Sequence, residues 1–571
     1  MSQTPLKQRE INDVFSSRQA GNGWASKNAM ICGLVVVVCI LACRPFAEIP
    51  YVDDWSMART ARIFAQTGQV AYNGWAAMPQ GWQIVWGAIF INIFGFSYTV
   101  LRLSLLPVVF ATIYLFQLSL AQFRFTQKHA TFGALVFGLS PIFLPVASSF
   151  MTDIPGVAVI LLCLFLCQKA IAAPSSSATI LWLTAAALTN LVGGTVRQTS
   201  FLGVLVMVPS VGWALRKRRG VLTTAGCLTA VSGLVILGYL KWYLAQPYSV
   251  PEHFLRVEPN GAVLIHLAGQ LLTAFLFLLL SVLPALGLFS LDLLRLGGKT
   301  FWTGVATTAA TLVALVATRH LTPLGVLFSK FNIDLRLPQL LLCLALVSAV
   351  LAITRLLISR QMRVTEPRIS SADWKEILSL LGPYSLAYFL LLLPRGAAGW
   401  IWDRYLLGLI PLVIIVVLKL HQQYVDDRIT PTAVVLLACM ALFGIGRADK
   451  HYAEKRALVK AIAMLRADNV PRSAISAGFE YNCETEAELS GHLNEPKVQV
   501  PAGAYRPYTP PPRLPPSVRG WFNSYTPSVK PQFFVLSDPD PSLAATKYPT
   551  IGYWTILPPF HRRIYIETLP Q

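Results

Sequence analysis

The sequence predicts an α-helical polytopic membrane protein with a small α/β domain at its C-terminal end. Three observations support this prediction. The 571-residue chain is 54% hydrophobic and only 13% charged, with a mean hydropathy of +0.55, which no ordinary soluble fold of this length carries. Apolar runs long enough to cross a bilayer recur through residues 29–446. After Gly446 the composition changes to that of a polar, soluble tail.

The apolar runs predict about thirteen transmembrane helices. They lie near residues 29–47, 99–121, 131–150, 154–172, 179–196, 200–215, 221–241, 267–291, 301–318, 338–356, 376–394, 405–420 and 430–446. An odd number of crossings places the two chain ends on opposite sides of the membrane. The aromatic-rich run 82–97 spans only about sixteen residues, so we expect it to lie along the membrane surface.

The basic residues indicate how the chain is oriented. The formal net charge is +20, but the Lys and Arg side chains lie in short loops between the predicted helices. This distribution argues against a nucleic-acid partner and follows the positive-inside rule. The rule predicts a protein of the plasma (inner) membrane with a cytoplasmic N-terminal tail, 1–28, and an extracytoplasmic domain, 447–571. Of the nine cysteines only Cys483 lies in that domain, so no disulfide is expected within it.

Two regions outside the membrane are predicted to be structured. In the first outer loop, 48–98, Asp53 and Asp54 would open a helix, Trp55–Gln66, that Gly68 would close. The C-terminal domain is predicted to contain a basic amphipathic helix at 450–467, strands at 474–479, 532–536 and 561–566, and a proline-rich linker at 501–531.

Ionisable residues are nearly absent from the middles of the predicted spans, where ion-coupled transporters place them. They gather instead at the predicted outer ends of odd-numbered helices: Asp53 and Asp54, Asp153, Arg197, and Asp403 with Arg404. Carboxylates beside arginines suit a reaction in which a hydroxyl group attacks and a lipid phosphate leaves. A carboxylate can accept the hydroxyl proton, and arginines or a carboxylate-bound metal can stabilise the phosphate.

Four segments carry a resemblance to a known superfamily. The first-loop segment YVDDWSMARTARIFAQTGQ resembles the first-loop acidic motif of the GT-C integral membrane glycosyltransferases, which include protein O-mannosyltransferases and the lipid A aminoarabinose transferase. SSFMTDIPG resembles their second-loop acidic motif, and RQTS and WDRYLLGLIP resemble basic motifs of bacterial members. The resemblance covers about residues 30–446 and makes 29–446 the catalytic membrane domain.

The resemblance implies an inverting glycosyltransferase. It would move a sugar from a polyprenyl-phosphate donor to a hydroxyl acceptor on a glycolipid, polysaccharide or protein, at the outer face of the membrane. Asp53 would be the catalytic base, with Asp54 as a second catalytic carboxylate beside it. Arg197, Arg404 and Tyr405 would bind the donor phosphate. Membrane lipids would be the other partners.

Other interpretations of these residues stay open. Asp153, with Asp53 or Asp54, could hold a divalent metal, Mg, Mn or Zn. All three carboxylates could instead cap helices, and Arg197 and Arg404 could anchor the chain at the membrane surface. Two rival functions also remain: a transporter or flippase that moves a lipid-linked sugar without chemistry, and an inactive scaffold that keeps the fold.

Overall fold

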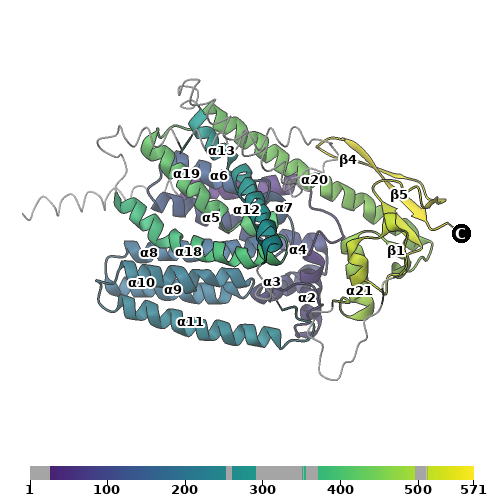
Figure 1. The fold of residues 1–571 in the computed structure, drawn as a ribbon, viewed down its shortest axis with the longest axis horizontal. Coiled ribbons are helices and arrows are strands. Elements are labelled where there is room, and N and C mark those ends of the chain that lie inside the picture. Colours follow the sequence, from purple (N-terminus) through teal and green to yellow (C-terminus); the bar gives the residue numbers. More distant parts are fainter. Residues whose placement is uncertain are drawn as a thin grey trace, which may run out of the picture.

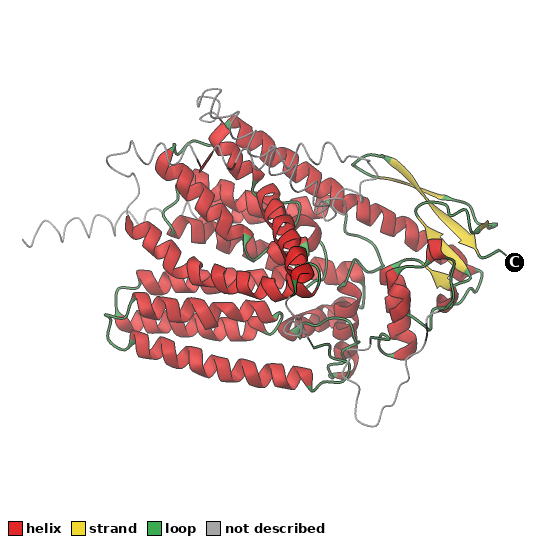
Figure 2. Cartoon of the chain, in the orientation of Figure 1, coloured by secondary structure: helices red, strands yellow, loops and turns green. Residues whose placement is uncertain are grey.

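The computed structural model describes residues 26–251, 260–290, 350, 353–354, 371–495, 510 and 512–570. The chain is a bundle of helices with a small sheet-containing domain at one end (Figures 1 and 2). The predicted fold class, a polytopic helical membrane protein with a small C-terminal α/β domain, is therefore confirmed.

Seven helices within these ranges are long and apolar enough to cross a membrane. They are Tyr98–Gln122, which comprises α4 (Tyr98–Ser104) and α5 (Leu106–Gln122), α8 (Asp153–Ala172), α9 (Ser176–Gly194), α11 (Val221–Leu244), α12 (Gly261–Ser281), the Trp374–Ala398 part of α18 (Ser371–Ala398), and α20 (Pro431–Ala467). Their apolar residues are divided between protein and lipid. In the apolar 18-residue stretch of α8, 72% of the residues are buried, whereas in that of α11 only 22% are buried. Helix α8 therefore lies inside the bundle and α11 at its lipid-facing edge.

The predicted count of about thirteen spans is not confirmed. Three predicted spans form shorter apolar helices, Ser26–Ala42, Gln198–Ala214 and Ile410–Tyr424 (α19). The predicted span 131–150 is broken into α6 (Gln127–Gly138) and α7 (Phe143–Ala147), because Pro141 between them cannot donate a helical hydrogen bond. The span at 301–318 and most of the span at 338–356 lie outside the described residues.

The first outer loop contains two helices. The first, α2 (Asp54–Thr67), matches the predicted helix, and it ends at Gly68, whose left-handed backbone (φ 70°) lets its N–H bond the carbonyl of Phe64. The second, α3 (Gly81–Phe94), has 14 residues and is about 21 Å long, too short to span a bilayer. This length agrees with the predicted surface helix.

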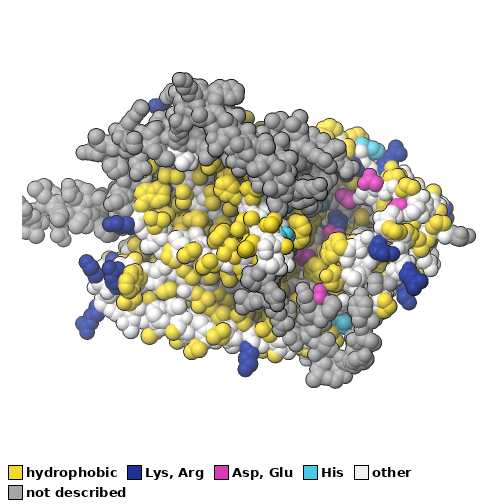
Figure 3. All heavy atoms as spheres, in the orientation of Figure 1, with side chains coloured by type: hydrophobic (Ala, Val, Ile, Leu, Met, Phe, Trp, Pro, Cys, Tyr) yellow, Lys and Arg dark blue, Asp and Glu magenta, His cyan; other side chains and the backbone are white. Residues whose placement is uncertain are grey.

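Charge is distributed unevenly along the bundle. Figure 3 shows Lys and Arg side chains at both ends of the molecule, whereas acidic side chains are visible only toward the C-terminal domain, so the opposite end is basic. The loop between α10 (Val208–Ala214) and α11 belongs to the basic end and exposes Lys217. The first outer loop and the C-terminal domain share the opposite end (Figure 1). The relative placement agrees with the predicted topology, and the absolute orientation remains a prediction.

The helix α20 joins the membrane bundle to the C-terminal domain without a break. It combines the predicted span 430–446 and the predicted helix 450–467 into one helix of 37 residues. At 1.5 Å per residue its length is about 55 Å, well beyond the roughly 30 Å bilayer core. Its second half therefore projects from the membrane, and the predicted boundary at 446/447 falls inside a continuous helix.

The sheet of the C-terminal domain confirms the three predicted strands and adds two. Its strands are β1 (Ile475–Ser476), β2 (Phe533–Leu536), β3 (Ala544–Ala545), β4 (Ile551–Trp554) and β5 (His561–Thr568). The order is β1-β2-β5-β3, with β4 also paired to β5. Strands β1 and β2 are parallel, and the other pairs are antiparallel. Strands β3 and β4 and the helix α21 (Phe479–Ser490) were not expected from the sequence.

The core of the C-terminal domain includes the start of the first outer loop. Ile49 and Tyr51 are buried in one cluster with Tyr452 of α20, Val535 of β2 and Ile564 of β5. The ring of Tyr51 stacks on that of Tyr452, with centroids 5.3 Å apart. The domain is therefore packed directly on the segment that leads into Asp53 and Asp54.

Candidate active site

Each of the three predicted carboxylates forms an ion pair with a different arginine. Arg404 Nη2 lies 2.7 Å from Asp53 Oδ2, Arg197 Nη1 lies 2.5 Å from Asp153 Oδ1, and Arg102 Nε lies 3.2 Å from Asp54 Oδ2. The fold thus brings together residues that are far apart in the sequence. The three pairs differ in burial and in the surroundings of the carboxylate.

Asp53 occupies the N-cap position of α2 but does not cap it with its side chain. Its Oδ1 accepts a hydrogen bond of 2.8 Å from Trp75 Nε1, while Oδ2 faces Arg404. The residue is 8% exposed. The alternative that Asp53 serves only as a helix cap is therefore not supported by the geometry.

Asp54 points in a different direction, into the protein. Its Oδ1 accepts a 2.6 Å hydrogen bond from the N–H of Tyr51, and Oδ2 pairs with Arg102. Arg102 also donates to the carbonyl oxygens of Ala47 and Ile49. Asp54 is 0% exposed; burial raises the pKa of its carboxyl group, an effect that Arg102 opposes. Asp54 therefore holds the chain before α2 in place, and its carboxylate faces away from solvent.

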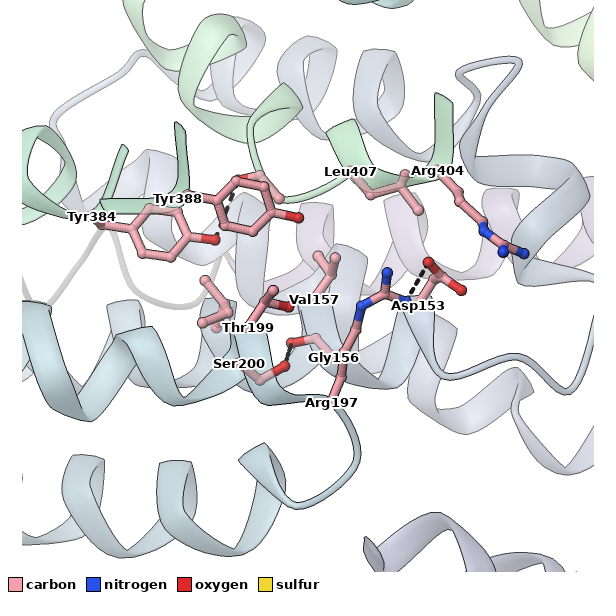
Figure 4. A pocket seen from close by; sticks show the side chains of 12 residues that line it. Asp153, Gly156, Val157, Arg197, Thr199, Ser200, Tyr384, Tyr388, Arg404 and Leu407 are labelled. Atoms are coloured by element: carbon pink, nitrogen blue, oxygen red, sulfur yellow. Dashed lines mark hydrogen bonds and ion pairs between the residues drawn. The ribbon is translucent and has the colours of Figure 1, made fainter. Parts of the chain in front are cut away.

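Asp153 is the first residue of α8, and its side chain is directed toward Arg197 (Figure 4). Arg197 follows α9 and precedes the short helix η1 (Gln198–Phe201). Burial acts to lower the pKa of its guanidinium, but the Asp153 carboxylate raises that pKa overall. Asp153 is nearly buried, and its Oδ2 has no hydrogen-bond partner among the described residues. This oxygen is therefore buried without a partner within the described ranges, although other atoms of Asp153 line the pocket described next.

A pocket connects Arg197 and Arg404. It contains about 290 Å³ of empty space, part of it open to solvent. Its lining comprises Asp153, Gly156, Val157, Ile160, Arg197, Thr199, Ser200, Tyr384, Tyr388, Arg404, Leu407 and Gly408. Figure 4 shows Arg197 and Arg404 at one side of this pocket and the two tyrosines of α18 at the other. The pocket therefore combines two cations, one carboxylate and an apolar wall.

Tyr405 lies among the arginines of the site. The guanidinium carbons of Arg395, Arg197 and Arg404 are 5.3, 5.4 and 5.7 Å from its ring centroid. Its hydroxyl oxygen accepts a hydrogen bond from Arg395 Nη2, and its carbonyl oxygen accepts one of 2.8 Å from the hydroxyl of Tyr388. The ring thus positions cations that would otherwise repel one another. Burial acts to lower the pKa of the Arg404 guanidinium, but the nearby Asp53 carboxylate raises that pKa overall.

Four residues near the site were not predicted from the sequence: Trp75, Tyr384, Tyr388 and Arg395. The two tyrosines are four residues apart in the apolar helix α18, so they share one helix face. This spacing was a usable signal. Trp75 carried no such signal, because its contact with Asp53 depends on how the first outer loop folds.

The divalent metal expected at Asp153 with Asp53 or Asp54 stays a prediction. The described ranges hold no group of three or more His, Cys, Asp or Glu side chains that could bind a metal ion. Asp53, Asp54 and Asp153 each face an arginine, and a guanidinium already supplies the positive charge that a metal would bring. The arginines therefore supply positive charge at this site.

Comparison with known proteins found similarity only at the level of structure. No family model and no curated protein matches the chain. ArnT from Cupriavidus metallidurans in the apo state is similar over 81% of this chain and 84% of that chain, with a TM-score of 0.41 and 17% identity. The same protein bound to undecaprenyl phosphate gives a TM-score of 0.40 and 17% identity, over 79% of this chain and 81% of that chain.

A second similar protein is the archaeal oligosaccharyltransferase AglB from Archaeoglobus fulgidus, in complex with an inhibitory peptide and a dolichol-phosphate. The match covers 78% of this chain and 58% of that chain, with a TM-score of 0.37 and 14% identity. These likenesses concern the fold.

Proposed function

We propose that the protein is an inverting glycosyltransferase that moves a sugar from a polyprenyl-phosphate donor to a hydroxyl acceptor at the outer face of the membrane. The observation that carries this proposal is the position of Arg404. It forms an ion pair with Asp53 and also lines the pocket that contains Arg197 and Asp153. One cation therefore links a candidate base to a candidate phosphate pocket.

The donor phosphate binds between Arg197 and Arg404. Two guanidinium groups can meet phosphate oxygens with paired N–H donors, which gives stronger and more directional binding than two ammonium groups. Arg395 contributes further positive charge from behind Tyr405. The apolar wall at Val157, Ile160 and Leu407 suits the adjoining part of a lipid-linked donor.

Asp53 acts as the base. The acceptor hydroxyl donates its proton to Asp53, and the hydroxyl oxygen attacks the anomeric carbon of the donor sugar. The bond from that carbon to the phosphate oxygen breaks, and its electron pair leaves with the polyprenyl phosphate. Arg197 and Arg404 stabilise the charge that develops on this leaving group. Attack opposite the leaving group inverts the anomeric configuration.

The remaining predicted residues support these two. Asp54 is a positioning residue, because its bonds to Tyr51 and Arg102 fix the segment that precedes α2. Asp153 orients Arg197 through Oδ1. Tyr405 spaces the arginines.

The proposal is tested with the full chain purified in lipid nanodiscs and a panel of polyprenyl-phosphate sugars. Mass spectrometry should detect free polyprenyl phosphate together with a glycosylated acceptor, and NMR should show that the anomeric configuration is inverted. A flippase would instead relocate the intact donor between the leaflets of a vesicle and release nothing. Repeating the assay with a chelator tests the metal: we expect transfer to continue, since arginines provide the charge, and loss of transfer that Mg²⁺, Mn²⁺ or Zn²⁺ restores would reinstate a metal at Asp153.

A further inference from the structure

Aromatic side chains from the first outer loop and the C-terminal domain gather beside Asp53. The ring centroid of Trp75 lies 5.1 Å from that of Phe479 in α21, 5.7 Å from Tyr525 and 6.1 Å from Trp521. Trp521 and Tyr525 belong to the short helix η7 (Trp521–Tyr525). Figure 1 shows α21 beside α2, at the end of the bundle that carries the C-terminal domain.

This group is more than a buried core. Its base is buried, with Cys483 and Trp55 fully enclosed beneath it. Phe479 and Trp75 are only partly buried, and Trp521 is 64% exposed. A contiguous aromatic patch that reaches solvent is typical of a binding surface, and tryptophan is enriched at the residues that bind most strongly there. The aromatic group therefore begins at solvent with Trp521 and reaches Asp53 through the indole N–H of Trp75.

Carbohydrate is the chemistry that fits such a surface. One face of a sugar ring presents C–H groups with slight positive charge, which pack on the negatively charged face of an aromatic ring. The ring hydroxyls project from the edge, where a carboxylate can reach them. An extended peptide usually adds to the edge of a sheet, but the edge strand next to α21, β1, has only two residues.

We propose that Trp75, Phe479, Trp521 and Tyr525 form an acceptor surface that packs against a carbohydrate ring and brings one of its hydroxyls to Asp53. The inference rests on the proposed function, because it gives the class of the hydroxyl acceptor. Trp75 has two roles in it: its ring belongs to the surface, and its N–H holds Asp53 Oδ1. Binding of the acceptor and orientation of the base thus depend on the same side chain.

The first test measures binding and needs no donor. A panel of neutral oligosaccharides built from glucose, galactose, mannose or N-acetylglucosamine is titrated into the full chain in nanodiscs by calorimetry. Trp521→Ala should weaken binding roughly tenfold, since one stacked ring is lost, while Trp521→Phe should keep most of it. Trp554→Ala is the matched control, because Trp554 is 70% exposed and lies in β4.

The second test measures transfer to the same oligosaccharides. Trp521→Ala should raise the acceptor KM, whereas Trp554→Ala should leave it at the parent value. Parent-like KM in Trp521→Ala, an equal rise in Trp554→Ala, or transfer only to serine- and threonine-containing peptides would each overturn the inference. If the parent protein binds oligosaccharides through Trp521 but never consumes a donor, the proposed transferase activity is wrong, whereas the carbohydrate-binding surface is supported.

Discussion

Arg404 Nη2 lies 2.7 Å from Asp53 Oδ2, although the two residues belong to opposite ends of the membrane domain sequence. The second carboxylate oxygen of Asp53 is held by Trp75. Asp53 is thus fixed from two sides in an orientation that a helix cap does not require. This relationship separates the chemical role of Asp53 from the structural role of its neighbour Asp54.

Asp53→Asn should abolish sugar transfer and leave folding intact. Asparagine has nearly the same shape and can still accept the Trp75 hydrogen bond, but it cannot accept a proton. A positioned base is worth about 10² to 10⁴ in rate. The measurement is kcat for transfer, with donor affinity and melting temperature recorded on the same preparation. Near-parent turnover in a folded Asp53→Asn protein would show that Asp53 is not the base.

Asp54→Asn should have the opposite profile and mainly reduce stability. The change leaves the buried guanidinium of Arg102 without its counter-charge, and breaking one side of a buried ion pair costs about 3 to 5 kcal/mol. We expect a lower melting temperature in nanodiscs than for Asp53→Asn, which serves as the matched control. Equal melting temperatures together with lost transfer in Asp54→Asn would instead indicate a direct chemical role.

Arg197→Lys and Arg404→Lys should weaken donor binding. Lysine keeps the charge but loses the paired N–H donors that match phosphate oxygens. Equilibrium binding of polyprenyl phosphate to the purified variants measures the effect, and we expect a loss of roughly tenfold or more in each. Arg216→Lys is the control, because Arg216 is exposed in the loop between α10 and α11. Parent-like affinity in both variants would indicate that Arg197 and Arg404 are membrane anchors and do not bind the phosphate.

Topology can be tested by thiol labelling in intact cells. Gln66→Cys, exposed at the end of α2, should react with an impermeant reagent, whereas Lys217→Cys should react only after the membrane is opened. Native Cys483 should stay unlabelled although its domain is predicted to lie outside. It is fully buried, and burial raises the pKa of its thiol well above the usual value, which suppresses the reactive thiolate. Labelling of Lys217→Cys in sealed cells would reverse the orientation.

The acidic and basic residues of the site could be found from the sequence because charges are rare in such an apolar chain. Asp53, Asp153, Arg197 and Arg404 stood out at the predicted ends of apolar runs, and the fold does bring them to the same site. Their pairing could not be predicted. Asp403, which the sequence placed beside Arg404, has its side chain 3.6 Å from Arg447 and accepts the backbone N–H of Arg404.

The sequence by itself determined the membrane location, the helix α2 and three of the strands, because hydropathy, helix caps and alternation act over a few neighbouring residues. Only the tertiary structure decided that Asp53 faces the arginine pocket while Asp54 is buried against Arg102. Adjacent residues at a helix start point in different directions, and what each direction meets is set by distant segments. The place of Trp75 between Asp53 and the C-terminal domain has the same origin, since it depends on long-range packing.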